Sequence, residues 1–201
     1  MKRPLILGLT GSIGMGKTTT AQMFAEAGVP VWDADAAVHR LYAPGGAAVP
    51  VVAALCPTAV GPEGVDRTAL KDWLARAPGS LGRLEAAVHP LVAVDRAAFV
   101  EAAARAGADL VLLDVPLLFE TGTDAQCDTT ITVTAPAEVQ RDRVLARPGM
   151  TPATLDALRG RQLPDAQKRA RADHVIETTT MEGARAAVQA LLARLRSDRD
   201  A

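Results

Sequence analysis

Residues 11–18 read Gly-Ser-Ile-Gly-Met-Gly-Lys-Thr and directly follow the apolar run Leu5-Ile6-Leu7-Gly8-Leu9. A glycine, four variable residues and then Gly-Lys-Ser/Thr, placed between a strand and a helix, is the pattern of a phosphate-binding loop. Its glycines let the backbone turn so that N–H groups point inward and form a cradle for phosphate oxygens. The pattern therefore predicts that this chain binds a nucleoside triphosphate.

The last two residues of the loop carry reactive side chains. Lys17 is expected to reach the β- and γ-phosphates, and the hydroxyl of Thr18 is expected to bind Mg²⁺. A glycine-rich turn that matches by accident is the alternative, and the strand pattern before the loop and the helical pattern after it argue against that reading. We assign nucleotide binding to the whole loop: Gly11, Ser12, Ile13, Gly14, Met15, Gly16, Lys17 and Thr18.

The composition describes a globular chain without a global charge bias. It has 201 residues, of which 49% are hydrophobic and 22% charged, and its formal net charge is −1. This length suits one domain with insertions, and the small net charge favours neither a nucleic-acid nor a membrane partner. Cys56 and Cys127 are the two cysteines, which in a phosphate-loop protein indicates reduced thiols, so we expect a cytoplasmic protein.

Apolar runs alternate with helical patterns along the chain, which is typical of an α/β fold with a parallel sheet. The expected strands are Leu5–Thr10, Val29–Trp32, Leu110–Asp114, Thr129–Val133 and His174–Ile176. The expected helices are Lys17–Ala27, Ala86–Ala106, Pro136–Ala146, Pro152–Arg161 and Met181–Arg196.

Two regions interrupt this alternation. Residues 39–106 are mostly helical in pattern and contain several Pro and Gly turn signals, more chain than a simple crossover needs; we expect a helical subdomain that covers an acceptor site. Residues 138–171 contain eight basic and four acidic side chains. Beside a phosphate loop, this cluster predicts a lid that closes over polyphosphate, and a solvated helical face is the alternative.

Two aspartates follow the second expected strand, at the sheet edge where the phosphate loop should lie. Asp33 suits a residue that accepts a proton from an acceptor hydroxyl or orders water around Mg²⁺, whereas Asp35 suits the N-cap of a helix that begins near Ala36. Asp114 ends a buried strand and is either a second acidic residue beside Mg²⁺ or a turn aspartate. By spacing alone, His89-Pro90 is a loop residue and a proline in the first turn of a helix.

Two classes of function are disfavoured by what the sequence lacks. The chain contains no asparagine, so it has no Asn-Lys-x-Asp motif of the kind that reads guanine in regulatory GTPases. The two cysteines have no zinc-site spacing, and no nucleophile elbow is present.

The combined pattern resembles the dephospho-coenzyme A kinase family over nearly the whole chain. The matching motifs are Leu9 through Thr18, Asp33-Ala34-Asp35 followed by His39-Arg40-Leu41, His89-Pro90, Val115-Pro116-Leu117-Leu118-Phe119-Glu120, and Arg159 through Gln162 leading to Lys168 and Asp173. The order of Asp-Ala-Asp and Val-Pro-Leu-Leu-Phe-Glu is the specific part. The chain departs from the family pattern at Ser12, at Met15 and at Glu177-Thr178-Thr179-Thr180.

The resemblance implies an α/β fold of the P-loop kinase type, with a parallel sheet flanked by helices, a helical acceptor-binding insertion and an arginine-rich lid. The expected parts are a nucleotide core (1–38, 107–137 and 172–201), an acceptor subdomain (39–106) and a lid (138–171). ATP is the implied phosphoryl donor, with Mg²⁺. The implied acceptor-side residues are Asp33, Asp35, His89, Pro116, Leu117 and Glu120, and the implied polyphosphate contacts are Arg143, Arg147 and Arg159, with Lys17, Asp33 and Arg143 as catalytic candidates.

The expected activity is phosphorylation of the ribose 3′-hydroxyl of dephospho-coenzyme A, by a monomer or weak homo-oligomer. A different small-molecule kinase of the same architecture, such as a nucleoside monophosphate kinase, is the first alternative. A non-catalytic nucleotide-gated binding module is the second. Acceptor dependence of ATP turnover separates these three.

Overall fold

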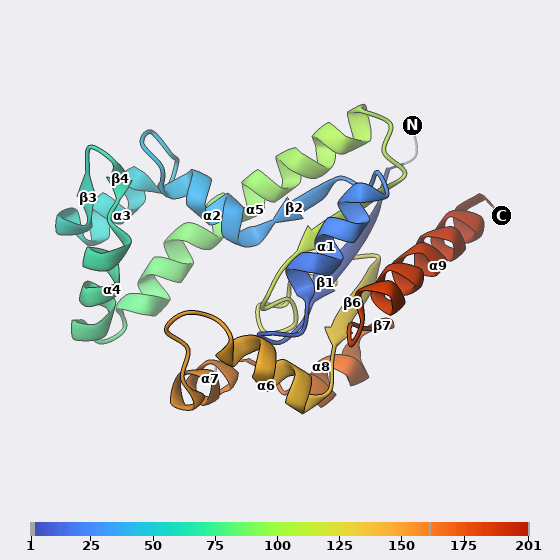
Figure 1. The fold of residues 1–201 in the computed structure, drawn as a ribbon. Coiled ribbons are helices and arrows are strands. Elements are labelled where there is room, and N and C mark those ends of the chain that lie inside the picture. The colour runs from blue at the N-terminus through green and yellow to red at the C-terminus, as the bar shows by residue number, and fades with distance from the viewer. Residues whose placement is uncertain (1–2, 161, 201) are drawn as a thin grey trace. The chain divides into compact units, whose positions relative to one another are not determined.

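The computed structural model describes residues 3–160 and 162–200 and divides into two compact units (Figure 1). We call them the sheet unit, which contains the chain up to Trp32 and again from Ala103, and the helical unit, Asp33–Ala102. Among the described residues, no helix combines the length and the apolar composition needed to cross a membrane.

The sheet unit is built on a five-stranded sheet with the order β2-β5-β1-β6-β7. Strand β1 pairs in parallel with β5 and with β6, and β6 pairs in parallel with β7, which confirms the expected parallel sheet. The strands are β1 (Leu5–Thr10), β2 (Val31–Asp33), β5 (Leu110–Asp114), β6 (Thr129–Thr134) and β7 (His174–Glu177).

Helices α1 and α9 pack together against this sheet. Their apolar faces join inward side chains of the strands in one buried cluster, which includes Leu7, Phe24, Leu112, Ile131 and Leu192. Strands β1 and β5 are largely buried, and they read as nearly continuous apolar runs in the sequence. The remaining elements of this unit are α1 (Lys17–Glu26), η2 (Thr123–Gln126), α6 (Ala137–Leu145), α7 (Pro152–Arg159), α8 (Asp165–Arg171) and α9 (Met181–Asp200); the expected end of α7, Arg161, lies outside the described residues.

The helical unit has its own core, formed by Leu41, Val52, Leu70, Leu84 and Val88 with smaller residues between them. The unit also contains a short antiparallel hairpin, β3 with β4, whose residues Val60 and Val65 pack against this core. The elements are α2 (Ala34–Tyr42), α3 (Val49–Leu55), η1 (Pro57–Ala59), β3 (Val60–Gly61), β4 (Gly64–Val65), α4 (Arg67–Arg76) and the greater part of α5 (Ser80–Arg105).

The expectation that Pro90 lies in the first turn of a helix is wrong, because α5 begins at Ser80 and Pro90 is inside it. A proline in a helix interior loses a hydrogen bond and costs about 3 kcal/mol. Here apolar side chains before and after the proline, Val88 and Leu91, pack on the same core. Burial of this face on both sides of Pro90 offsets the local penalty, so the helix continues.

Candidate functional site

The phosphate loop connects β1 to α1 with glycines where other residues would not fit. Gly14 and Gly16 have φ values of 78° and 83°, in the left-handed region. A Cβ on Gly14 would lie 2.5 Å from Val144 Cγ2, and one on Gly16 would lie 2.9 Å from Thr178 Oγ1. Gly16 is also the N-cap of α1 and supplies no capping side chain. The first-turn amides of α1 are therefore not capped by a side chain, which leaves them suited to bind an anion.

Met15 is one of the departures from the family pattern. It connects the phosphate loop to the residues that follow β6 and β7. Its side chain is 3% exposed, its Sδ accepts a hydrogen bond from Ala135 N at 3.1 Å, and its carbonyl accepts one from Thr178 Oγ1 at 2.9 Å. Ser12 is also buried, and its carbonyl accepts from Met15 N.

Lys17 begins α1 and forms an ion pair with Asp114, the last residue of β5. Lys17 Nζ lies 2.6 Å from Asp114 Oδ1, and the Asp114 side chain is 2% exposed. Thr18 follows in the first turn and is exposed. The structure thus brings the expected phosphate-binding lysine, the expected Mg²⁺ hydroxyl and the strand-end carboxylate into one region of the sheet unit.

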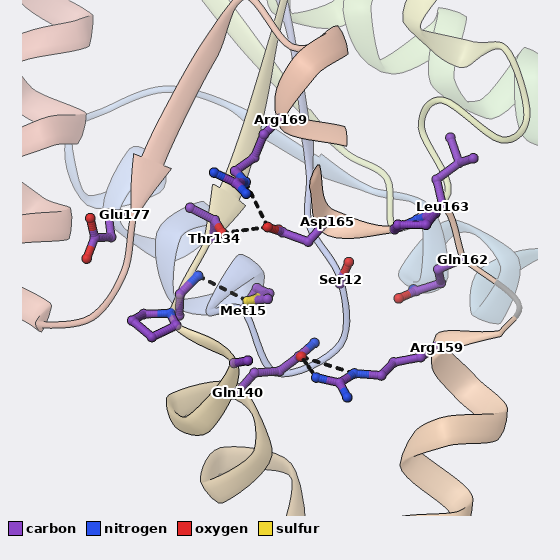
Figure 2. Close-up of a pocket in the computed structure, with 14 residues that line it drawn as sticks. Ser12, Met15, Thr134, Gln140, Arg159, Gln162, Leu163, Asp165, Arg169 and Glu177 are labelled. Carbon is purple, nitrogen blue, oxygen red and sulfur yellow. Dashed lines mark hydrogen bonds and ion pairs between the residues drawn. The ribbon is translucent and has the colours of Figure 1, made fainter. Parts of the chain in front are cut away.

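Two glutamine side chains form hydrogen bonds with the backbone of Ile13. Gln140 Nε2 donates to Ile13 O at 2.7 Å, and Ile13 N donates to Gln162 Oε1 at 3.1 Å. Arg159 Nε donates to Gln140 Oε1 at 3.1 Å, so Arg159 is linked to the phosphate loop through Gln140 (Figure 2). Sequence reasoning missed Gln140; its signal was a polar residue on the otherwise apolar buried face of α6, where it is 3% exposed.

A cavity of about 620 Å³ lies beside this part of the loop (Figure 2). Its lining includes Met15, Gln140, Arg159 and Gln162, with Glu177 at the end of β7. A smaller hollow of about 220 Å³ is lined by Gly14, Gly16, Thr19, Arg143, Arg147 and Thr180. Both hollows lie within the sheet unit and border the phosphate loop.

Arg143 braces the segment that follows β7. Its Nη2 donates to Thr178 O at 2.6 Å and its Nη1 donates to Thr178 Oγ1 at 3.2 Å. Thr178 is 5% exposed, which gives this departure from the family pattern a structural role. Arg147 lies one turn further along and is exposed, with its side chain lining the smaller hollow.

The segment after β5 carries three of the expected acceptor-side residues. Pro116 O accepts from Thr10 Oγ1 at 2.9 Å, and Leu117 is 37% exposed. Glu120 Oε1 accepts from Leu163 N at 2.8 Å and lies 2.8 Å from Lys168 Nζ. Burial alone would raise the pKa of Glu120, but the hydrogen bonds from Lys168 and Leu163 together hold it below its usual value.

The other expected acceptor-side residues belong to the helical unit, and one expectation about them is wrong. Helix α2 begins at Ala34, and its N-cap is Asp33, whose Oδ1 accepts from Ala36 N at 2.9 Å. Asp35 lies exposed in the first turn instead of capping the helix, because the helix starts two residues earlier than its pattern indicated. His89 is exposed on α5.

The described residues contain no group of three or more His, Cys, Asp or Glu side chains arranged to hold a metal ion. Neither Cys56 nor Cys127 forms a disulfide in the described part of the chain.

The comparisons with known proteins point in one direction. A family model described as dephospho-CoA kinase matches residues 5–182. The dephospho-CoA kinase of Cereibacter sphaeroides is 61% identical over 99% of this chain and 100% of its own length. That of Jannaschia sp. is 56% identical over 94% of this chain and 96% of its own length.

Solved structures agree with the fold. TT1252 from Thermus thermophilus superposes with a TM-score of 0.82 and 37% identity, covering 96% of this chain and 99% of that one. A dephospho-CoA kinase from Campylobacter jejuni superposes with a TM-score of 0.73 at 17% identity, covering 96% and 98% of the two chains. At that identity the second match supports the fold alone.

Proposed function

This chain belongs to the dephospho-CoA kinase family, and from that membership we propose that it transfers the γ-phosphoryl group of ATP to the ribose 3′-hydroxyl of dephospho-coenzyme A. This is the last step of coenzyme A synthesis. The observation that carries the proposal is the phosphate loop, where α1 begins without a side-chain cap and the Lys17 ammonium pairs with the buried carboxylate of Asp114.

The loop and α1 supply the electrostatics for transfer. The transferring phosphoryl group spreads negative charge over its oxygens, and preorganised N–H groups and a cation stabilise that charge without reorganising. The loop residues Gly11 to Thr18 hold the β- and γ-phosphates, with Lys17 as the cation. Thr18 offers its hydroxyl to Mg²⁺, which when bound neutralises phosphate charge.

On the acceptor side, Asp33 orients or deprotonates the attacking hydroxyl. Its cap bond uses Oδ1, so Oδ2 is the oxygen assigned to the proton. The cap bond limits the freedom of that carboxylate, so its orientation is set before the acceptor binds. Asp35, His89, Pro116 and Leu117 contribute to binding of dephospho-coenzyme A, and Glu120 supports that binding.

The basic segment 138–171 acts as the lid. Arg147 is exposed and lines the smaller hollow with Arg143, and Arg159 is linked to the loop through Gln140. Guanidinium groups in such positions suit bidentate contacts to phosphate. Arg143 and Arg159 hold fixed positions beside the loop, and Arg147 is assigned to the nucleotide directly.

We place the protein in the cytoplasm as a monomer or weak homo-oligomer that binds neither nucleic acid nor membrane. The small net charge of −1 favours neither polyanion nor anionic lipid.

The deciding experiment measures ADP release with dephospho-coenzyme A, AMP, UMP or no acceptor, each with and without Mg²⁺. We expect turnover with Mg²⁺ and dephospho-coenzyme A, and a product phosphorylated at the 3′ position by phosphorus NMR. Faster turnover with a nucleoside monophosphate would replace the proposal by a monophosphate kinase. ATP turnover that needs a protein partner and no acceptor would replace it by a regulatory module.

A further inference from the structure

Lys168 is a fully buried cation in the sheet unit. It lies on α8 with 0% exposure, and its ammonium has three N–H donors. The ammonium contacts Pro116 O at 3.1 Å and Thr10 Oγ1 at 3.4 Å, and it pairs with Glu120 Oε1 at 2.8 Å. Each donor thus has an acceptor, which a buried lysine requires if it is to keep its charge.

Glu120 faces inward toward this cation. Its Oε1 receives both Lys168 Nζ and Leu163 N, and its Oε2 is buried without a hydrogen-bond partner among the described residues. Oε2 is therefore closed to an acceptor molecule, and Oε1 is already occupied by two donors. The position of this carboxylate is better explained by its contacts with Lys168 and Leu163 than by a direct contact with substrate.

Two of the segments that Lys168 and Glu120 contact lead to the phosphate loop. Thr10 immediately precedes Gly11, the first residue of the loop. Leu163, held by Glu120, is adjacent to Gln162, whose Oε1 accepts from Ile13 N. The Lys168 ammonium and the Glu120 carboxylate therefore position both the start of the phosphate loop and Gln162, which accepts a hydrogen bond from the loop.

We infer that Lys168 and Glu120 are positioning residues for phosphoryl transfer, because together they hold the phosphate loop and Gln162 in contact. Glu120 acts through Lys168 and does not touch dephospho-coenzyme A. This inference rests on the activity proposed above and refines the role of Glu120 in it. An error of about 1 Å in the position of reacting groups lowers rates by about 10²-fold, so a pair that holds the loop affects catalysis without contacting substrate.

The test is a double-mutant cycle with Lys168→Met, Glu120→Gln and both together, and Lys71→Met on exposed α4 as a matched lysine control. We expect each single variant to lower kcat by about 10- to 100-fold and to weaken ATP binding measured by calorimetry, with the KM for dephospho-coenzyme A changed by less than about threefold. Because the pair acts as one unit, the double variant should be no worse than the more severe single variant. Lys71→Met should match wild type.

A direct acceptor contact predicts a different pattern, in which Glu120→Gln raises the KM for dephospho-coenzyme A, Lys168→Met does not, and the two effects multiply. That result would overturn the inference. If the single variants do not fold, Lys168→Met with Glu120→Leu removes both charges and keeps the site filled, a change that buried pairs often tolerate. A folded double variant with wild-type kcat and ATP affinity would reduce the pair to a purely structural role. Wild-type activity with dephospho-coenzyme A tests the proposed function separately, and ATP binding by the variants is measured whether or not that activity is found.

Discussion

Lys17 Nζ lies 2.6 Å from Asp114 Oδ1, so the lysine of the phosphate loop is paired with a strand-end carboxylate that is 2% exposed. We propose that this pair holds the Lys17 ammonium in position before nucleotide binds. The same contact means that Lys17 contributes to stability as well as to the site, because a buried carboxylate that loses a cation loses part of its compensation for desolvation.

We expect Lys17→Ala to lower kcat by about 10²–10³-fold, since a preorganised cation facing phosphate charge is lost. We also expect a lower Tm, because Asp114 remains buried without the ammonium. Asp114→Asn in the Lys17→Ala background should recover Tm but not kcat. Steady-state kinetics and thermal melts on the same preparations check both, and near-wild-type turnover by folded Lys17→Ala would remove its catalytic assignment.

Asp33→Asn separates catalysis from helix capping. Asn caps helices about as well as Asp, and the cap bond from Ala36 N needs one side-chain oxygen, so Tm should be unchanged. A proton-accepting role predicts that kcat falls by about 10²–10⁴-fold while dephospho-coenzyme A still binds.

Two further variants complete the Asp33 test. Asp33→Ala should in addition destabilise the protein by about 1 kcal/mol, through loss of the cap. Asp35→Asn, at an exposed position in the first turn of α2, should change kcat only slightly. A dead Asp35→Asn beside an active Asp33→Asn would reverse the two assignments.

Arg143 and Arg147 should respond differently to substitution by Gln. Arg147 is exposed, so its loss should raise the KM for ATP with little change in Tm. Arg143 donates hydrogen bonds to Thr178 O and Oγ1. Its loss should therefore lower Tm and also weaken the binding of ATP. The parallel Arg159→Gln variant tests the link through Gln140. Unchanged kinetics in all three would assign the basic segment to a solvated surface.

Gly14→Ala should abolish turnover and lower stability, because φ is positive and the new Cβ would lie 2.5 Å from Val144 Cγ2. Gly28→Ala is the matched control, with a φ of 83° and no neighbouring atom within 4 Å of the added Cβ. It should cost only the left-handed strain of about 1–2 kcal/mol and keep kcat. Equal losses of activity in the two variants would contradict a close-packed loop.

Low pH should weaken the hydrogen bonds by which Asp173, just before β7, contacts Thr130 of β6. Hydrogen bonds from Thr130 Oγ1 and N stabilise the carboxylate and lower its pKa. A group whose pKa is lower in the folded state stabilises the protein above its unfolded pKa, and that stability is lost as pH falls through the folded value. Wild type should therefore lose stability below about pH 4, more steeply than Asp173→Asn, in denaturant melts at fixed pH. Parallel pH curves for the two proteins would contradict this role.

Local patterns predicted most of the sheet unit. The expected strands Leu5–Thr10 and Leu110–Asp114 have the observed bounds, because a buried parallel strand is a short apolar run that ends where polar residues begin. Helix starts were harder. Asp33 and Asp35 are both good caps by type, and the choice between them depends on where β2 stops, which packing decides.

The sequence by itself determined the phosphate loop, the lysine and threonine that follow it, and the family, since each depends on residue types at fixed spacing along one stretch of chain. Tertiary structure decided which distant side chains meet. Lys17 pairs with Asp114 across 97 positions, and Lys168 reaches Thr10 across 158. No periodicity encodes such pairs, because parallel strands bring residues together through crossover connections of variable length. The partner of a buried charged side chain is therefore the residue that the folded sheet places within hydrogen-bond distance.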